Sequence, residues 1–346
     1  MPDIIQNSTS ETRLLGDDAF LRKVAQLYYE DNYSQETIAD MVYCSRQTIG
    51  KALQKARERK IIRTAVVPDE RTGYLRNLAR RVRIELTLED LVLVPGQSTH
   101  TIAATTTYDE VVVEIARSAA EYLDQMLTDD DIVAVSGGKT FIRNMVRYLN
   151  PTKTLSHMQT VATIGFADAH TNFGDANLIA YDLAMAYGAS HMWFPCPAIL
   201  PDAKEVAIVR QLPIVRQAYE LMQRASIVIT SLWLPDLNDP TIKRYAHSDE
   251  QMAMLEDSAP IVDINHWLFN AFGDCINETL KPFPYALSGI EISRFKERIQ
   301  QNSSKVMLVI GGNPSYVPAI RAILKAGVVS ILVTDHLTAQ ALLEIS

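Results

Sequence analysis

Most of this sequence shows a repeating pattern that restricts the fold. From residue 91 onward, apolar runs of four to seven residues alternate with longer amphipathic segments. Short apolar runs are typical of strands buried on both faces, and amphipathic segments between them are typical of covering helices. We therefore predict an α/β domain with a mainly parallel sheet over residues 91–346. The predicted strands are 91–94, 132–136, 158–164, 227–230, 306–310 and 330–333, and the predicted helices are 108–126, 140–149, 175–187, 206–224, 292–301 and 318–325.

The N-terminal part has a different pattern, in which two short helices are joined by a tight turn. Residues 34–60 are SQETIADMVYCSRQTIGKALQKARERK, with Ser34 and Ser45 placed as helix N-caps. Apolar residues recur at helical spacing after each serine, and the small residue Ala39 lets the two helices approach. This pattern predicts a helix-turn-helix. Tyr43 occupies the turn position where such motifs usually have Gly, so we expect strain of about 1 kcal/mol or a slightly different turn.

A preceding helix completes this small domain. Phe20, Val24, Leu27 and Tyr28 recur at helical spacing and provide an apolar face to cover the hairpin. Pro68 ends the apolar segment that follows the hairpin, and we place the domain boundary there. The predicted organisation is a disordered tail at 1–17, a helix-turn-helix DNA-binding domain at 18–67, a connector helix at 68–90 and an α/β effector-binding and oligomerisation domain at 91–346.

The second helix of the motif has polar and basic residues at its N-terminal end. In a recognition helix this end contacts base edges and phosphates in the major groove, so we expect Arg46, Gln47, Thr48 and Lys51 to face outward. The predicted DNA-binding residues are Ser45, Arg46, Gln47, Thr48, Lys51 and Lys55. The competing interpretation is an amphipathic helical hairpin that binds nothing. Agreement of the N-caps, the small residue, the apolar spacing and the charge argues against it.

The distribution of charge supports contact with nucleic acid. The whole chain has a net charge of −8, which alone would argue against a DNA-binding protein. Between Arg46 and Arg83, however, there are twelve Lys or Arg residues and three acidic ones, so the rest of the chain has a net charge of −17. A basic module on an acidic body confines phosphate contact to one end of the protein.

Composition excludes several other classes of protein. Cys44, Cys196 and Cys275 are far apart and odd in number, so we expect buried thiols rather than disulfides. The seven His residues form no HxH or HExxH spacing, and we expect neither a metal site nor a cofactor. No apolar run reaches the roughly 18 residues of a membrane span, and the first residues lack the order of a signal peptide. We therefore expect a cytoplasmic protein with no membrane partner.

Three predicted strands end at glycine-containing turns. Ligands of parallel sheets bind where strands end and helices begin, so these turns are the candidate effector site. At the first turn, VSGGKT at 135–140, backbone amides, a cation, a hydroxyl and the start of a helix would form a phosphate cradle, although no GxxxxGK[ST] motif is present. The alternative at each turn is a tight connection that needs Gly only for its backbone. The candidate residues at the three turns are Ser136, Gly137, Gly138, Lys139 and Thr140, then Gly165 and Phe166, then Gly311, Gly312 and Asn313.

The order of these motifs resembles the SorC-type sugar-binding transcription regulators over nearly the whole chain. SQETIA and SRQTIGKALQKARERKII are similar to that family's DNA-binding domain, and DIVAVSGGKT is similar to its phosphate loop. The segments NLIAYDLAMAYGASHMWFPCPAIL and VMLVIGGNPSYVPAIRAILKAGVVSILVTDHLTAQALL resemble its later motifs. The resemblance implies an effector domain similar in fold to sugar-phosphate isomerases and glucosamine-6-phosphate deaminases, assembly as a tetramer, and response to phosphorylated sugars.

Departures from the family pattern concern the effector. Gly137 stands where the family loop commonly has an aromatic residue, and Ile164 stands where some members have a Lys able to form a Schiff base. The family's Gly-Asp pair is Val262-Asp263 here, and the resemblance implies that Asp263 accepts hydrogen bonds from sugar hydroxyls. The Lys after the C-terminal Gly-Gly is replaced by Ser315 or Tyr316. Lys139 is therefore the expected compensating cation.

The predicted function is a DNA-binding transcriptional regulator of a sugar-utilisation operon. Its predicted partners are double-stranded operator DNA, a small phosphorylated sugar or related anionic metabolite, and further copies of the chain in a dimer or tetramer. The alternative is a sugar-phosphate isomerase or deaminase with a helical appendage, which requires an acid/base pair. Asp168 with His170, and Asp263, are the candidates for such a pair, and a solvated loop pair and a ligand-binding carboxylate are their simpler interpretation.

Overall fold

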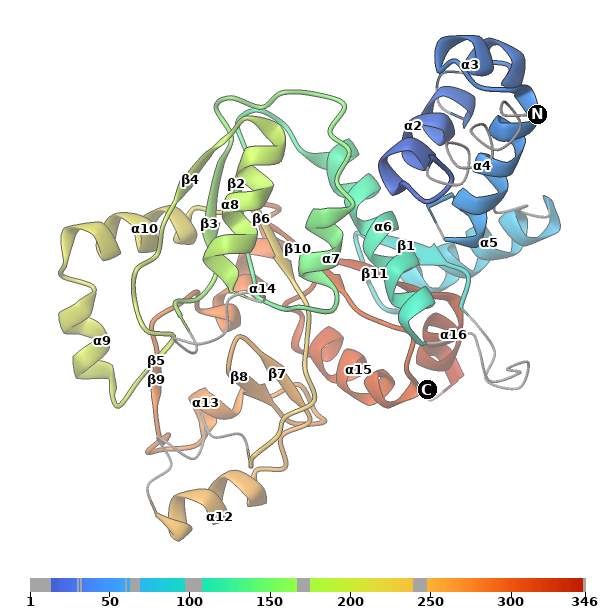
Figure 1. Ribbon diagram of the computed structural model, residues 1–346. Helices are drawn as coiled ribbons and strands as arrows, with labels where there is room; N and C mark the ends of the chain where they lie inside the picture. Colours follow the sequence, from blue (N-terminus) through green and yellow to red (C-terminus); the bar gives the residue numbers. More distant parts are fainter. Residues whose placement is uncertain are drawn as a thin grey trace. The chain divides into compact units, whose positions relative to one another are not determined.

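The computed structural model divides the chain into two compact units, Met1–Arg71 and Thr72–Ser346. It describes residues 14–29, 31, 33–59, 61–62, 69–96, 108–166, 175–238 and 248–344. The predicted N-terminal tail and the predicted boundary at Pro68 lie largely outside these residues. Figure 1 shows a helical first unit and a second unit built on a central sheet.

The first unit contains the predicted three helices: α2 (Asp18–Tyr29), α3 (Gln35–Met41) and α4 (Arg46–Glu58). Ser34 caps α3 by accepting a hydrogen bond from the Thr37 amide, and Ser45 caps α4 by accepting one from the Thr48 amide, both at 3.1 Å. Each cap satisfies a backbone donor that the helix leaves unpaired. The buried side chains of the unit are Leu21, Val24, Ile38, Ala39, Ile49, Ala52, Leu53 and Ala56.

The turn between α3 and α4 has the geometry that favours glycine. Tyr43 adopts a φ of 54°, in the left-handed region, and its side chain is 96% exposed. This conformation costs an L residue roughly 1 kcal/mol, and an exposed ring makes few packing contacts that offset the cost. The expected strain at this position is therefore present.

The helix that follows belongs mainly to the second unit. Helix α5 spans Asp69–Glu85, and Leu78 and Val82 on its C-terminal half are buried in the core of the α/β domain. Tyr74 near its start has a ring contact with His336, in the last helix of the chain. The predicted connector is thus anchored on the second unit along much of its length.

The second unit is organised around a seven-stranded sheet in which every pairing is parallel. The strand order is β1-β11-β10-β6-β2-β3-β4. All six predicted strands are present with shifts of one or two residues at their ends, and β4 was not predicted. The strands are β1 (Asp90–Val94), β2 (Ile132–Val135), β3 (Gln159–Ala162), β4 (Ser190–Met192), β6 (Ile227–Thr230), β10 (Lys305–Val309) and β11 (Ile331–Asp335).

Helices cover both faces of this sheet, which confirms the predicted fold class. Helices α6 (Tyr108–Met126), α7 (Ile142–Arg147) and α8 (Ala176–Tyr187) lie side by side on one face (Figure 1). They belong to connections that run toward the β4 edge, whereas the connections through the other helices run toward the β1 edge. Right-handed crossovers place these two groups on opposite faces. The second group is α10 (Pro213–Gln223), α14 (Phe295–Gln300) and α15 (Val317–Ala326). Helix α16 (His336–Glu344) follows the last strand, β11, and packs against α15.

Small elements complete the second unit near the ends of the strands. Strand β5 (Ile199–Leu200) pairs with β9 (Ala286–Leu287), and β7 (Val262–Ile264) pairs with β8 (Trp267–Phe269) in a tight hairpin. The two turn residues of this hairpin, Asn265 and His266, have φ angles of 53° and 64°, as a two-residue turn requires. The remaining elements are α9 (Ala203–Val209), α12 (Asp249–Asp257), α13 (Ile276–Thr279) and the short 3-10 helices η2 (Ile292–Arg294) and η3 (Pro314–Tyr316).

The structure corrects two of the predicted helices. Residues 206–224 form two helices rather than one, because Pro213 removes a backbone donor and starts a new helix at its first position. The helix predicted at 140–149 begins only at Ile142 and has six residues. Residues 139–141 form a turn that precedes it.

Candidate functional site

The exposed N-terminal end of α4 is the candidate DNA-contacting surface. Arg46, Gln47, Lys51 and Lys55 are all exposed on this helix. Their side chains lie on the side of α4 away from Ile49, Ala52, Leu53 and Ala56, which are buried in the core of the first unit. Three cations and an amide on the exposed face of a helix are suited to phosphates and base edges.

Thr48 does not face outward as predicted. It is only 6% exposed, and its hydroxyl lies 2.8 Å from the hydroxyl of Ser45. Thr48 occupies the third position of α4, where a side chain commonly pairs with the N-cap residue. Ser45 and Thr48 therefore share a capping interaction that fixes where the helix begins.

In the second unit, the carboxyl ends of β2 and β6 form a topological switch point. The chain leaves β2 through α7 toward β3, and it leaves β6 in the opposite direction toward β10. Connections that diverge to opposite faces of a parallel sheet leave a crevice between the two strand ends, where ligands of such sheets bind. The first predicted turn follows β2 directly, so it lies at this crevice.

A chain of buried hydroxyl groups joins the strands around the crevice. Thr163 Oγ1 donates to Ser136 Oγ at 3.1 Å, Ser136 Oγ donates to Thr230 Oγ1 at 2.9 Å, and Thr230 Oγ1 donates to the Ser231 carbonyl at 3.0 Å. Ser231 Oγ in turn donates to the Val309 carbonyl at 2.8 Å. These contacts hold the ends of β3, β2, β6 and β10 together. Ser136 was predicted to bind the effector, but its hydroxyl is already used in this series of hydrogen bonds.

The turn after β2 has backbone donors without acceptors. The amides of Gly137, Gly138, Lys139 and Thr140 donate no hydrogen bond to any residue that the structure describes. The side chains of Lys139 and Thr140 are exposed, and Gly138 has a φ of 131°. Because α7 begins at Ile142 and has only six residues, the groups at this turn that are suited to an anion are these amides rather than a helix dipole.

Trp233 is a residue of this crevice that sequence reasoning missed. A Cβ atom built on Gly138 would lie 3.1 Å from Trp233 Cζ2, so the indole ring covers the glycine. The backbone of Trp233 exchanges two hydrogen bonds of 2.9 Å with Asp263 of β7. Directly paired residues of antiparallel strands project to the same face. Asp263 and Trp233 therefore project on the same side as the Gly138 turn.

The carboxylate of Asp263 also has a local role. Its Oδ1 accepts a hydrogen bond of 2.8 Å from the His266 amide and thereby closes the hairpin turn between β7 and β8. Its Oδ2 lies 3.8 Å from His266 Nδ1. The other predicted acid/base candidates, Asp168 and His170, lie outside the described residues.

The second predicted turn is explained by close packing. A Cβ on Gly165 would lie 1.8 Å from the Cys196 carbonyl oxygen, so only glycine fits there. Phe166 pairs through its backbone, donating to the Cys196 carbonyl at 2.8 Å and accepting from the Ala198 amide at 2.9 Å. Its ring stays 42% exposed. A ligand role for these two residues remains a prediction.

At the third turn, the polar groups are occupied by neighbouring residues. The Gly312 amide donates to Asp335 Oδ2 at 2.6 Å, and a Cβ on Gly311 would lie 2.7 Å from the same carboxylate oxygen. Asn313 Oδ1 accepts hydrogen bonds from the amide and the hydroxyl of Ser315 at the start of η3. These contacts shape the loop after β10, and a ligand role for the three predicted residues remains a prediction.

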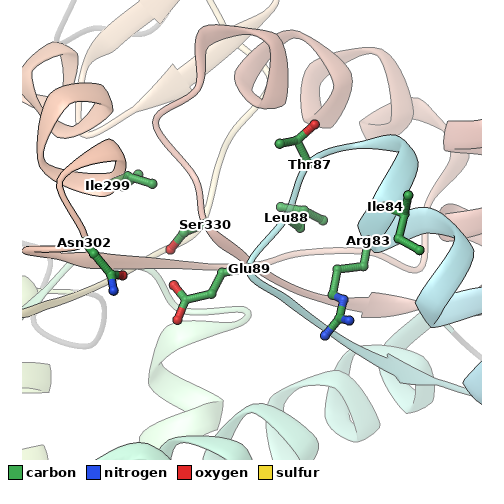
Figure 2. Close-up of a pocket in the computed structure, with 8 residues that line it drawn as sticks. All are labelled: Arg83, Ile84, Thr87, Leu88, Glu89, Ile299, Asn302 and Ser330. Carbon is green, nitrogen blue, oxygen red and sulfur yellow. The ribbon is translucent and has the colours of Figure 1, made fainter.

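A surface pocket of about 430 Å³ lies at the other end of the strands, where β1, β10 and β11 begin. Figure 2 shows its lining residues, which come from the end of α5, from α14 and from the segments that precede β1, β10 and β11. Its Glu89 carboxylate is paired with Lys305 at 2.8 Å. None of the predicted effector residues belongs to it. The lining residues are Arg83, Ile84, Thr87, Leu88, Glu89, Ile299, Asn302 and Ser330.

Metal sites and membrane-spanning helices are the other features of interest. Within the described ranges, no group of three or more His, Cys, Asp or Glu side chains is placed to hold a metal ion. None of the helices in that same part of the chain is both long and apolar enough to cross a membrane.

Comparisons with known proteins agree on one family. Residues 71–344 match the Sugar-bind family of sugar-binding domains. The deoxyribonucleoside regulator of Bacillus subtilis is 24% identical over 323 residues, covering 92% of this chain and 96% of that protein. The transcriptional regulator LsrR of Escherichia coli is 21% identical over 341 residues, covering 98% of this chain and 99% of that protein.

Solved structures show the same fold. The full-length sorbitol operon regulator SorC of Klebsiella pneumoniae matches with a TM-score of 0.71 and 20% identity, covering 94% of this chain and 99% of that one. A transcriptional regulator of Streptococcus pneumoniae matches with a TM-score of 0.67 and 16% identity, covering 79% of this chain and 98% of that one. These matches favour a regulator over the enzyme alternative. The chain belongs to the Sugar-bind family and is a SorC-type transcriptional regulator.

Proposed function

We propose that this regulator binds a phosphorylated sugar, or a related anionic metabolite, in the crevice between β2 and β6, and that the bound effector controls its affinity for operator DNA. Operator contact is made by Arg46, Gln47, Lys51 and Lys55 of α4. The regulated genes serve sugar utilisation, and the protein acts in the cytoplasm, where the operator lies.

The observation that carries the effector proposal is the set of unpaired amides from Gly137 to Thr140. Consecutive backbone donors without acceptors form an anion-binding concavity, and a phosphate has three oxygens to accept from them. Lys139 adds a cation beside the turn, and Thr140 adds a hydroxyl. A neutral sugar hydroxyl would leave most of these donors unused.

The energy available from this turn is sufficient for a metabolite sensor. Charge-assisted hydrogen bonds contribute roughly 1.5–3 kcal/mol each, and micromolar affinity corresponds to about 8 kcal/mol. Three or four such bonds to one phosphate therefore account for most of a micromolar binding energy. Hydrogen bonds from sugar hydroxyls to Asp263 supply a smaller part.

Operator recognition requires more than one copy of the chain. A single recognition helix reads only a few base pairs, and two-fold pairing of half-sites supplies the rest of the specificity. A homo-oligomer, either a dimer or a tetramer, is therefore part of the proposal. Sedimentation of the full-length protein tests it, and a monomer at the concentration where operator binding saturates would contradict it.

Calorimetric titration with matched sugar and sugar-phosphate pairs tests the effector site. We expect the phosphate ester to bind more tightly and Gly138→Val to abolish binding, because a side chain there strains the backbone and displaces Trp233. Operator affinity without effector should stay unchanged in this variant. Gly327→Val is the matched control, since Gly327 is another positive-φ glycine, at the C-terminus of α15.

Two results would contradict the assignment. One is equal affinity for a sugar and its phosphate ester across the panel, and the other is a Gly138→Val protein that titrates like the wild type. An Asp263→Ala variant provides an internal check. It should bind the effector more weakly but retain the preference for the phosphorylated ligand, because it leaves the amides of the turn intact.

A further inference from the structure

Trp233 has the features of a ligand-contacting side chain. It follows β6, and the two residues before it, Ser231 and Leu232, are buried, but Trp233 itself is 40% exposed. Its Nε1 donates no hydrogen bond within the part of the chain that the structure covers, whereas Trp267 Nε1 donates to the Ile290 carbonyl at 2.9 Å. A buried tryptophan usually pairs its N–H, as Trp267 does.

The position of the ring relative to the phosphate turn is fixed by the backbone. The two hydrogen bonds with Asp263 hold the Trp233 main chain on the β7–β8 hairpin, and the ring lies over Gly138. The unpaired amides of the turn, the flat face of the indole and the Asp263 carboxylate thus converge on the crevice between β2 and β6. A ligand whose phosphate occupies the turn extends over the indole.

We propose that Trp233 is a stacking platform that makes this site selective for ring-closed sugar phosphates over open-chain polyol phosphates. The inference rests on the proposed function of the crevice and adds the form of the sugar. A pyranose or furanose ring presents a flat C–H face that displaces water from the indole, whereas a flexible open chain presents no such face and loses more rotational freedom on binding. The indole N–H donates to a ring hydroxyl, and Asp263 accepts from another.

The expected selectivity follows from the apolar surface that the ring covers. Burying roughly 60–100 Å² of indole surface at about 25 cal/mol per Å² corresponds to a gain in affinity of roughly 10- to 70-fold. The wild-type protein should therefore bind a locked ring phosphate at least tenfold more tightly than the matching open-chain phosphate. Removing the indole should abolish this ratio without abolishing the preference for phosphate.

The test is calorimetric titration of the full-length protein with 1,5-anhydrohexitol 6-phosphates, which cannot open, and the corresponding hexitol 6-phosphates, in the gluco, manno and galacto configurations. Trp233→Leu should bind ring and open-chain phosphates equally, and Trp233→Phe should keep part of the ring preference. Trp193→Leu is the matched control, because Trp193 is similarly exposed, at 43%, and stacks on Tyr181 of α8 instead. Circular dichroism melting verifies that each variant is folded.

Each outcome distinguishes this inference from the proposal on which it rests. Wild-type protein that prefers phosphates but binds ring and open-chain forms equally overturns the platform and leaves the proposed function intact. Trp233→Leu that weakens both forms equally also overturns it, because Trp233 would then act by packing on Gly138. Failure of every phosphate in the panel to bind overturns the phosphate site and the platform together.

Discussion

Asp335 provides the sharpest test of how the effector unit is held together. It ends β11, is 2% exposed, and accepts four hydrogen bonds. Oδ1 accepts from the amides of Leu337 and Thr338 at 3.0 Å, which caps α16. Oδ2 accepts from the Gly312 amide and the Thr338 hydroxyl at 2.6 Å. One carboxylate therefore joins β11, α16 and the loop after β10.

The cost of removing this carboxylate follows from these contacts. Loss of an N-cap costs about 1 kcal/mol, and each donor left without an acceptor in a buried position costs about 1–3 kcal/mol. Asp335→Ala leaves the Gly312 amide and the Thr338 hydroxyl unpaired in addition to losing the cap. The expected decrease in the free energy of unfolding is about 3–7 kcal/mol.

Urea unfolding monitored by tryptophan fluorescence measures this decrease, because all three tryptophans, at 193, 233 and 267, lie in the second unit. Asp175→Ala is the matched control. Asp175 caps α8 by accepting from the Asn177 and Leu178 amides, and its loss should cost only about 1 kcal/mol. Equal destabilisation by the two variants, at unchanged denaturant dependence, would refute the argument that Asp335 joins three elements.

Three further predictions concern other parts of the chain. An Arg46→Ala, Lys51→Ala double variant should lose operator affinity, and the slope of log affinity against log salt concentration should decrease by roughly one to two. Unchanged affinity in a mobility-shift titration would contradict the α4 assignment. Gly50→Ala should stabilise the first unit by about 0.5–1 kcal/mol, because Ala loses less backbone entropy than Gly in a helix. The added Cβ meets only Gln35 Oε1, at 3.7 Å. Unaltered amide hydrogen exchange in α4 would count against this prediction. Burial lowers the pKa of His191 to about 4, and its Nδ1 lies 2.9 Å from the Thr160 hydroxyl oxygen. The unfolded chain therefore binds a proton near pH 6.5 that the folded chain does not, so this residue's contribution to stability falls as pH drops from 6.5 toward 4; urea titrations of His191→Asn across that range should lack this slope.

Features that depend on neighbouring residues were predictable from the sequence. The caps at Ser34 and Ser45, the strands of the sheet and the glycine turn after β2 each follow from residues close together in the chain. Apolar runs identify buried strands because every residue in them faces a covering layer. The same argument explains why the observed strand ends differ from the predicted ones by only one or two residues.

Features that depend on the order of strands were not predictable. β6 lies beside β2 although Ile132 and Ile227 are far apart in sequence, and only this neighbourhood brings Trp233 over Gly138. Thr48 was misplaced for a different reason. It lies four residues before the buried Ala52, on the same face of α4, and its hydroxyl pairs with that of the N-cap Ser45.

The pairing of β1 with β11 has a consequence for how the protein is made. Asp90 pairs with Ile331, so among the strands that the structure describes the first one is at the edge of the sheet and pairs with the last. At ribosomal rates of about 5–20 residues per second, β1 emerges on the order of tens of seconds before its partner exists. The helix-turn-helix needs only local contacts and can fold during that interval. A chain released early would therefore have a folded DNA-binding unit without a complete effector domain.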